Sequence, residues 1–316
     1  MRQLRRPVVA LPTLTHDGPG VREHQRQLGD VSRREQFPPH WLAGDVRGAL
    51  RAMQGWVCAY CLKALSDGDE VEHFRPKSLY WWLAYDFGNY FLACHRCNRA
   101  SVKGTRFPLV EGASRSTWET RSAIDDEPRL LAKPCTDPVD AWFTVDLFEN
   151  TFPVVLRRSV GRESRATQIV GKSIEVLQLN VDVDLVQARN RAWVSACKLM
   201  RNGEVDALRR RASRYAPQGM TWRAFIETMT DGVSLPTADE ELRWFLDDVY
   251  ERLCRHGALA RRELTSAALD REYEELGWLL AVIARDPPAL DAKAIGEWLK
   301  QRSLDEWVST YAKQFG

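Results

Sequence analysis

Two Cys-x2-Cys pairs, separated by 32 residues, constrain this chain more than any other feature of its sequence. The pairs are Cys58 with Cys61 and Cys94 with Cys97. A tetrahedral zinc site needs each pair on a tight turn, so that all four sulfurs reach one metal at about 2.3 Å. The interval is longer than in ordinary zinc ribbons. The cysteines therefore predict a structural Zn²⁺ site with further structure inserted between its two halves.

Disulfide bonds and a redox-active pair are the two alternatives for these cysteines. The N-terminal sequence does not follow the pattern of a secretory signal, because Pro7 and Pro12 interrupt its short apolar run. The other cysteines, Cys135, Cys197 and Cys254, are scattered and odd in number, which is typical of a reducing compartment. A second matching pair argues against redox chemistry. We therefore expect zinc ligands in a cytoplasmic protein.

The inserted segment contains two β-prone runs, 71–74 and 89–93, joined by a long loop. Pro76 favours an extended conformation at the residue before it, and Gly88 provides a turn before the second run. After the second cysteine pair, the polar segment 99–103 predicts a short helix that ends at the following glycine. The expected fold is therefore a small ββα-metal core, two strands and a helix around a metal.

Four residues in this region resemble the HNH (His-Asn-His/Asn, or His-Me finger) endonuclease motif, inside the four-cysteine zinc site that many HNH nucleases have. They are Glu72, His73, Asn89 and Asn98. The resemblance implies that His73 is the general base and that Asn89 supports the loop that orients it. It also implies that Glu72 and Asn98 bind a catalytic Mg²⁺ or Mn²⁺. The chemistry agrees, because an imidazole accepts a proton near neutral pH and oxygen ligands suit a hard divalent cation.

Each of these residues also has a structural explanation. A single Glu-His pair in a strand is more often a hydrogen-bonded pair than a catalytic one. Asn98 is a residue type that commonly caps a helix. His95, between the second pair of cysteines, has no ligand role when four thiolates complete the zinc site. The nuclease prediction therefore rests on the order and spacing of the whole set.

Basic side chains near the motif predict a polyanionic substrate. The segment 71–106 contains six Lys or Arg residues against two acids, whereas the whole chain balances 45 basic against 43 acidic residues. Affinity for DNA must therefore come from this region, from a partner or from oligomerisation. The candidate phosphate-binding residues, any of which is otherwise part of a solvated loop, are Arg75, Lys77, Arg99, Lys103 and Arg106.

The position of Lys103 departs from the HNH pattern. In many HNH proteins a lysine follows the motif's last Asn by three residues, but Lys103 follows Asn98 by five. Arg99 is therefore the alternative to Lys103 as the side chain that contacts phosphate.

Longer stretches narrow the resemblance to the PtuB-like HNH subunit of Septu-type anti-phage systems. The matching stretches are 71–77, 88–98 and 103–109, with support from 127–135 and 173–180. The resemblance implies a DNA-cleaving defence effector that a partner ATPase of the ABC/SMC type (PtuA-like) controls, with oligomerisation through that partner. The sequence Gly171-Lys172-Ser173 is not a phosphate-binding loop, because position 166 is alanine instead of glycine. Nucleotide control would therefore come from the partner.

The rest of the chain is predicted to be mainly helical. Apolar residues recur every three or four positions in 41–53, 181–201, 205–215, 238–255, 263–285 and 292–315. A hairpin is expected over 143–156, with its turn near Asn150. No apolar run is long enough to predict a membrane span.

These patterns divide the chain into four predicted parts. They are an N-terminal arm and helical lead-in (1–55), the HNH core (56–110), a mostly helical extension (111–216) and a C-terminal helical bundle (217–316). The tryptophans of the bundle form either its core or a face that binds a partner.

Two alternative functions remain beside a partner-controlled HNH endonuclease. One is a stand-alone restriction or toxin-type HNH nuclease, and the other is a non-catalytic zinc module that binds nucleic acid or serves as an adaptor.

Overall fold

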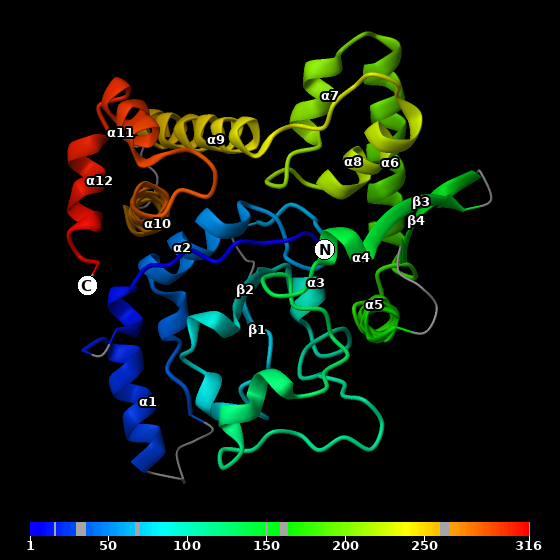
Figure 1. Ribbon diagram of the computed structural model, residues 1–316. Helices are drawn as coiled ribbons and strands as arrows, with labels where there is room; N and C mark the ends of the chain where they lie inside the picture. Colours follow the sequence, from blue (N-terminus) through cyan, green and yellow to red (C-terminus); the bar gives the residue numbers. More distant parts are fainter. Residues whose placement is uncertain are drawn as a thin grey trace. The chain divides into compact units, whose positions relative to one another are not determined.

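The computed structural model describes residues 1–15, 17–29, 36–66, 70–148, 151–158, 164–259 and 266–315 (Figure 1). The fold is mainly helical and divides into two compact units. Unit 1 comprises Met1–Leu4, Trp56–Leu83 and Phe91–Pro236, and unit 2 comprises Arg5–Gly55, Ala84–Tyr90 and Thr237–Gly316. Unit 1 thus extends beyond residue 216, and the four-part division of the chain stays a prediction.

Unit 1 contains a two-stranded sheet of β1 (Glu70–His73) and β2 (Tyr90–Ala93), of which only Tyr90 belongs to unit 2. The sheet confirms both predicted strands. The single-turn helix α3 (His95–Asn98) follows β2 directly and packs against β1. Two 3₁₀ helices belong to the loops of this part of unit 1, η4 (Trp81–Leu83) and η6 (Arg121–Asp126).

The helix predicted over 99–103 is wrong, because the helical turn lies earlier in the chain. Cys94 is the N-cap of the turn α3 and Cys97 lies within it, and Arg99 then adopts an extended backbone with φ −65° and ψ 155°. Residues 99–105 continue as turns, in which the Lys103 N–H donates to the Cys97 carbonyl at 3.1 Å. Gly104 has a φ of +42°, which disfavours a residue with a side chain. Closure of the cysteine knuckle therefore overrides the local helix signal.

The remainder of unit 1 is a hairpin and a group of helices. The hairpin is antiparallel, with Phe143 opposite Arg158 and Val145 opposite Leu156, as predicted for this segment. Asn150, expected at its turn, lies outside the described residues. The elements are α4 (Val139–Trp142), β3 (Phe143–Phe148), β4 (Thr151–Arg158), α5 (Arg165–Val176), α6 (Val183–Arg201), α7 (Val205–Arg211) and α8 (Gly219–Met229).

Unit 2 is built around the packing of α10 against α2 and α12. A methyl group on Gly48 of α2 would lie 2.5 Å from the Trp278 Cβ of α10, so glycine permits this close approach. The elements are η1 (Pro12–Leu14), α1 (Pro19–Gly29), η3 (His40–Leu42), α2 (Gly44–Gln54), η5 (Phe87–Asn89), α9 (Ala238–Leu259), α10 (Ser266–Arg285), α11 (Ala292–Gln301) and α12 (Asp305–Ala312).

The single helix predicted over 292–315 is in fact two helices. Helix α11 ends at Gln301 and α12 begins at Asp305, and between them Ser303 has a φ of 55°. A left-handed residue of this kind ends a helix instead of continuing it.

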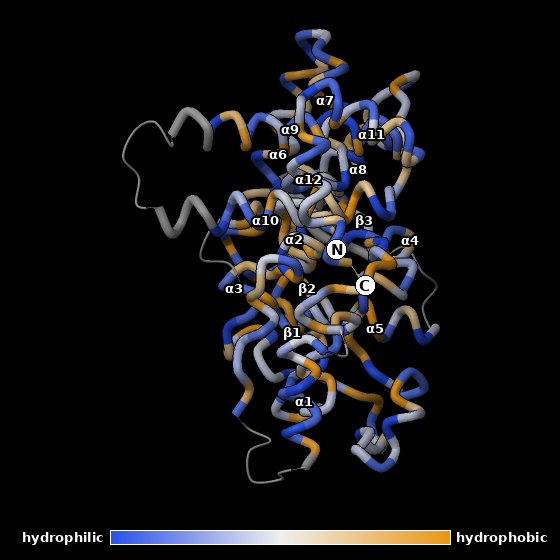
Figure 2. Tube along the Cα trace, turned by 90° about the vertical axis from the view of Figure 1, so that its left-hand side faces the viewer, coloured by the Kyte–Doolittle hydropathy of each residue, from blue (hydrophilic) through white to orange (hydrophobic). Residues whose placement is uncertain are grey.

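The helices of both units contain both apolar and polar residues. Figure 2 shows both hydropathy colours along most of them. Among the described residues, no helix combines the length and the apolar character that crossing a bilayer requires.

Candidate metal centre and active site

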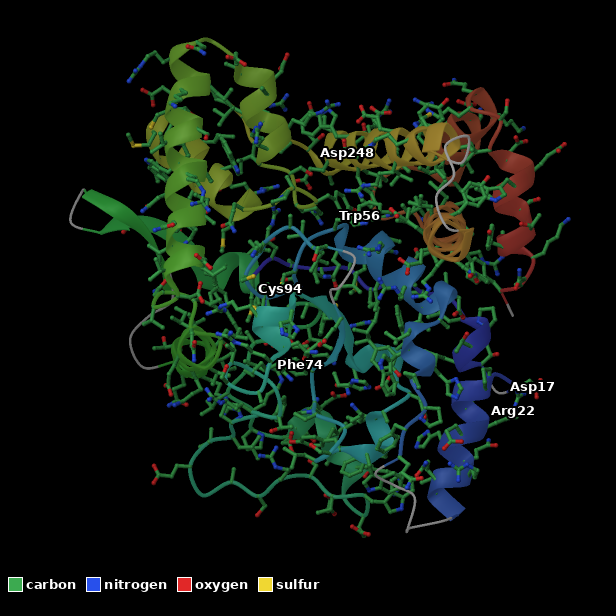
Figure 3. All side chains as sticks on the ribbon, turned by 180° about the vertical axis from the view of Figure 1, so that it is seen from behind. Asp17, Arg22, Trp56, Phe74, Cys94 and Asp248 are labelled. Atoms are coloured by element: carbon green, nitrogen blue, oxygen red, sulfur yellow. The ribbon has the colours of Figure 1, made fainter. Side chains whose placement is uncertain are left out.

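The four predicted zinc ligands lie together in the interior of unit 1. Their ligand atoms all lie within 4.8 Å of one another, and the Sγ atoms of Cys61 and Cys94 are 3.6 Å apart. Sulfurs at about 2.3 Å from a tetrahedral zinc are separated by about 3.8 Å, so the cluster fits this ion. Figure 3 shows Cys94 with its sulfur where α3 begins. The prediction of a site that can hold a structural metal is confirmed.

Tight turns bring the cysteine pairs to this position. In the first pair, the Leu62 N–H donates to the Cys58 carbonyl at 3.1 Å, and Leu62 has a left-handed φ of 61°. The Ala59 N–H donates to the Leu92 carbonyl of β2 at 3.1 Å, which connects this turn to the sheet. In the second pair, Cys94 is the N-cap of α3 and Cys97 lies in its single turn. Both halves of the site are therefore held by the sheet that also carries the HNH-like residues.

The four sulfurs compete for protons when they are this close. Hydrogen bonds from the three neighbouring cysteines lower the pKa of Cys94. The pKa of Cys61 is raised, mainly by its hydrogen bonds with Cys58 and Cys94, and the pKa of Cys97 is raised by its contacts with all three neighbours. A cation is the natural partner for such a group, because repulsion opposes ionisation of all four thiols.

Arg96 contributes positive charge to this cluster instead of facing a substrate. Its Nη1 lies 3.7 Å from the Cys97 Sγ, and its Nε donates to Asp182 at 2.7 Å. Nη1 also donates to the Leu177 carbonyl at 2.8 Å. Arg96 therefore connects the metal site to the N-terminus of α6, where Asp182 is the capping residue.

Glu72, predicted as a ligand of the catalytic cation, is enclosed by protein groups. Its side chain is 1% exposed and forms an ion pair with Lys103, which is fully buried. The Tyr60 hydroxyl donates to the other carboxylate oxygen at 2.5 Å, and burial raises the pKa of Tyr60. A hydrated Mg²⁺ needs a ligand that also faces water and substrate. The surroundings of Glu72 do not fit that role.

His73 ends β1 beside this buried pair. Its carbonyl accepts a hydrogen bond from the Lys103 Nζ at 2.9 Å. The next residue, Phe74, packs edge-on against Phe107 with ring centroids 5.3 Å apart. The backbone on both sides of His73 is thus held by interior contacts, and 8% of His73 is exposed.

Asn89 is the last residue of η5 and precedes β2 directly. It is buried, and its N–H donates to the Asp86 carbonyl at 2.9 Å. Its role in supporting the His73 loop stays a prediction.

Asn98 lies on α3 beside a carboxylate that the sequence analysis did not single out. The Asn98 amide donates to Glu70, whose second oxygen lies 3.7 Å from the His95 Nδ1. The Glu70 side chain is 46% exposed, in contrast to Glu72. The sequence did contain a signal for Glu70: side chains alternate between the two faces of a strand, so residues 70 and 72 share one face of β1.

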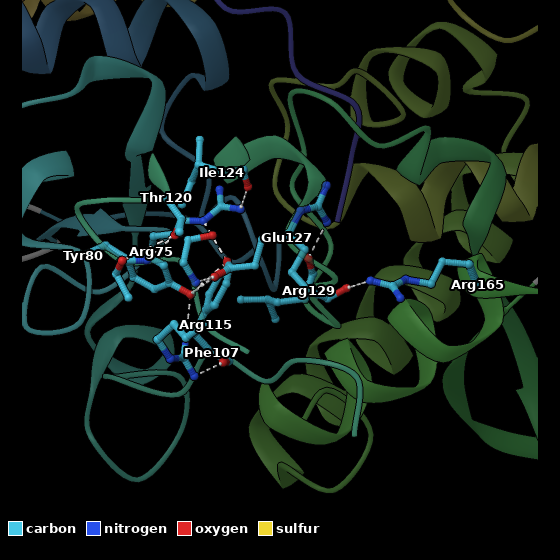
Figure 4. A network of polar contacts seen from close by, with 12 residues as sticks. Arg75, Tyr80, Phe107, Arg115, Thr120, Ile124, Glu127, Arg129 and Arg165 are labelled. Carbon is cyan, nitrogen blue, oxygen red and sulfur yellow. Dashed lines mark hydrogen bonds and ion pairs between the residues drawn. The ribbon is translucent and has the colours of Figure 1, made fainter. Parts of the chain in front are cut away.

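Arg75 was predicted to contact phosphate but lies inside a polar network (Figure 4). Its Nε is 3.2 Å from Glu127, whose side chain is fully buried. Glu127 also accepts from the Tyr80 hydroxyl at 2.8 Å and from the Ser116 N–H at 2.8 Å. Arg115 completes the network by donating to the Tyr80 oxygen at 2.6 Å. This network connects the residues that follow β1 to the loop that precedes Glu127.

The predicted phosphate-binding residues thus separate into two groups. Arg75 and Lys103 are buried in ion pairs with Glu127 and Glu72, so neither side chain reaches a phosphate without breaking its pair. The solvent-facing group consists of the exposed Arg99 and Arg106 and the half-buried Lys77. Burial lowers the pKa of Lys77.

The chain is similar to the Septu protein PtuB of Bacillus mycoides (strain KBAB4), with 32% identity over 108 residues. The similarity covers 29% of this chain and 36% of that relative's length. No family model and no solved structure matches the chain. The predicted resemblance to PtuB is confirmed.

Proposed function

We propose that this chain is a metal-dependent HNH endonuclease that hydrolyses DNA phosphodiester bonds in a Septu-type anti-phage system. The observation that supports this most is the grouping of the motif with the metal cluster. His73 ends β1, and Asn98 lies on the α3 turn that packs against β1. The four cysteines form one cluster on turns that are connected to the same sheet. The similarity to PtuB supports the defence role.

In this proposal the His73 imidazole accepts a proton from the attacking water. The hydrogen bond from Lys103 and the packing of Phe74 hold the backbone around His73 in place, so the main chain fixes where the imidazole is attached. The exposed Arg99 and Arg106 attract the phosphates on either side of the scissile bond. Asn98 would help to hold a Mg²⁺ or Mn²⁺, which when bound would supply positive charge to stabilise the phosphate and the leaving oxygen.

The partner is part of the same proposal. With a formal net charge of +2, the chain has no strong overall attraction for DNA. We propose that an ABC/SMC-type ATPase (PtuA-like) presents the DNA and binds the nucleotide that controls cleavage.

The test is cleavage of plasmid DNA by the chain with its partner ATPase, nucleotide and Mn²⁺. We expect His73→Ala to abolish cleavage while retaining zinc and the thermal unfolding midpoint. His40→Ala, on a 3₁₀ helix of unit 2, is the matched control and should cut normally. Normal cleavage by His73→Ala would refute the mechanism, and cleavage without partner or nucleotide would favour the stand-alone nuclease.

The buried Glu72–Lys103 ion pair favours a second candidate function, a non-catalytic zinc module that binds nucleic acid or acts as an adaptor. A module of this kind should bind DNA equally well with and without Mn²⁺, provided that zinc is retained. DNA cleavage that requires both Mn²⁺ and His73 excludes it.

A further inference from the structure

The proposed nuclease needs a carboxylate at its catalytic cation, and the contacts of Glu72 leave it unsuited to that task. One oxygen of Glu72 faces the Lys103 ammonium and the other accepts from Tyr60. The side chains of Glu72 and Lys103 are 1% and 0% exposed. A cation there would have to displace Lys103, and no coordination position would face solvent for water or a phosphate oxygen.

Lys103 already satisfies the charge of Glu72. The same ammonium donates to the His73 carbonyl at 2.9 Å. The ion pair therefore acts on the main chain of the predicted general base, and Tyr60 holds it from the other side. A buried charge that already has a partner of opposite sign and further hydrogen bonds serves the packing of the interior and is not available to bind a cation.

Glu70 has the properties that Glu72 lacks. It lies two residues earlier on β1, so both carboxylates leave the same face of the strand. Its side chain is 46% exposed and contacts the Asn98 amide, the other predicted ligand of the cation. The amide nitrogen donates to Glu70, and the side-chain oxygen of the same amide takes no part in this hydrogen bond. A partly exposed carboxylate and an amide group of two different residues thus lie side by side, and both groups contain the oxygen atoms that a hydrated Mg²⁺ or Mn²⁺ takes as ligands.

We propose that Glu70, and not Glu72, provides the carboxylate ligand of the divalent cation at Asn98, while the Tyr60–Glu72–Lys103 chain positions His73. This inference rests on the proposed function. The attacking and leaving oxygens of a phosphodiester lie roughly in line on opposite sides of phosphorus. The cation and the general base therefore act from separate positions, and His73 and the Glu70–Asn98 pair need not touch.

The experiment compares Glu70→Gln with Glu72→Gln, the same isosteric change at two positions of one strand. Mn²⁺ binding is titrated by electron paramagnetic resonance on the full chain, with zinc content and the thermal midpoint measured on each sample. We expect Glu70→Gln to weaken Mn²⁺ binding by about tenfold or more. Its midpoint should stay that of the wild type, because the side chain is half exposed. Glu72→Gln should keep its Mn²⁺ affinity and unfold at a lower temperature.

A second variant covers the case in which Glu72→Gln does not fold. Glu72→Gln with Lys103→Met removes both charges, and neutralising both members of a buried pair is tolerated better than removing one. We expect this double variant to fold and to bind Mn²⁺ as the wild type does.

Three results would overturn the inference. They are loss of Mn²⁺ binding in Glu72→Gln at an unchanged midpoint, loss of Mn²⁺ binding in the folded double variant, or no Mn²⁺ binding by the wild type. Failure of the proposed function would give another result: Mn²⁺ would still bind through Glu70, but no DNA would be cut.

Discussion

The network around Glu127 provides a stringent test of the forces that hold unit 1 together. Glu127 accepts hydrogen bonds from Arg75, Tyr80 and the Ser116 backbone, and its side chain is fully buried. Glu127→Gln keeps the shape but removes the charge opposite Arg75, which is itself only 4% exposed. Removing one partner of a buried pair costs about 3–5 kcal/mol, because the remaining charge loses its counter-ion. We therefore expect a large loss of stability from this single change.

Zinc release into a chromophoric chelator during urea unfolding is the appropriate assay, because all four cysteines belong to unit 1. With a urea dependence of about 2 kcal/mol/M, a loss of about 3–5 kcal/mol lowers the midpoint by about 1.5–2.5 M. The matched control is Glu111→Gln, an exposed glutamate of the same loop, which should leave the midpoint unchanged. Arg75→Met combined with Glu127→Gln should recover much of the loss. Equal midpoints for Glu127→Gln and Glu111→Gln would refute the reasoning.

Two further predictions concern the metal cluster and unit 2. Cys58→Ser should abolish stoichiometric zinc binding and lower solubility, because it removes a ligand of the metal. Cys254→Ser, at an exposed cysteine, is the control and should retain zinc. Equal zinc contents of the two variants by elemental analysis would contradict the proposed metal site. In unit 2, burial opposes ionisation of Asp286, but hydrogen bonds from Arg5 and the Val8 N–H lower the pKa of Asp286 below its usual 3.8. A lowered folded-state pKa stabilises the fold above the unfolded-state value and loses this effect as the pH falls through the folded-state value. Asp286→Asn should therefore be less stable than the wild type near neutral pH and similar to it in acid. A stability difference that persists at acid pH would exclude this origin.

Local patterns were sufficient to predict the elements of the candidate site. The cysteine spacing predicted the metal cluster, and the β-prone runs before His73 and before Cys94 became β1 and β2. Turn chemistry and side-chain periodicity act over a few residues, so the sequence reports them directly. The helix predicted over 99–103 failed because closure of the cysteine turn, a tertiary event, placed the helical residues earlier.

Local patterns could not predict which charged side chains pair with one another in the folded protein. Lys103 and Arg75 were both predicted at a phosphate, but the fold pairs them with Glu72 and Glu127 inside the protein. Arg75 and Glu127 are 52 residues apart, and Glu70 and Asn98 are 28 apart. An exposed basic side chain and a buried one have the same local sequence signature, because burial depends on what distant segments pack over them.

The sequence by itself therefore determined the type of metal site, its cysteine ligands and the strands that carry the HNH-like residues. Only the tertiary structure decided which carboxylate faces solvent and which is neutralised inside, since desolvation and ion pairing depend on the whole fold around each group. On that basis Glu72 belongs to the interior beside His73, and Glu70 with Asn98 forms the surface where we propose that the cation binds.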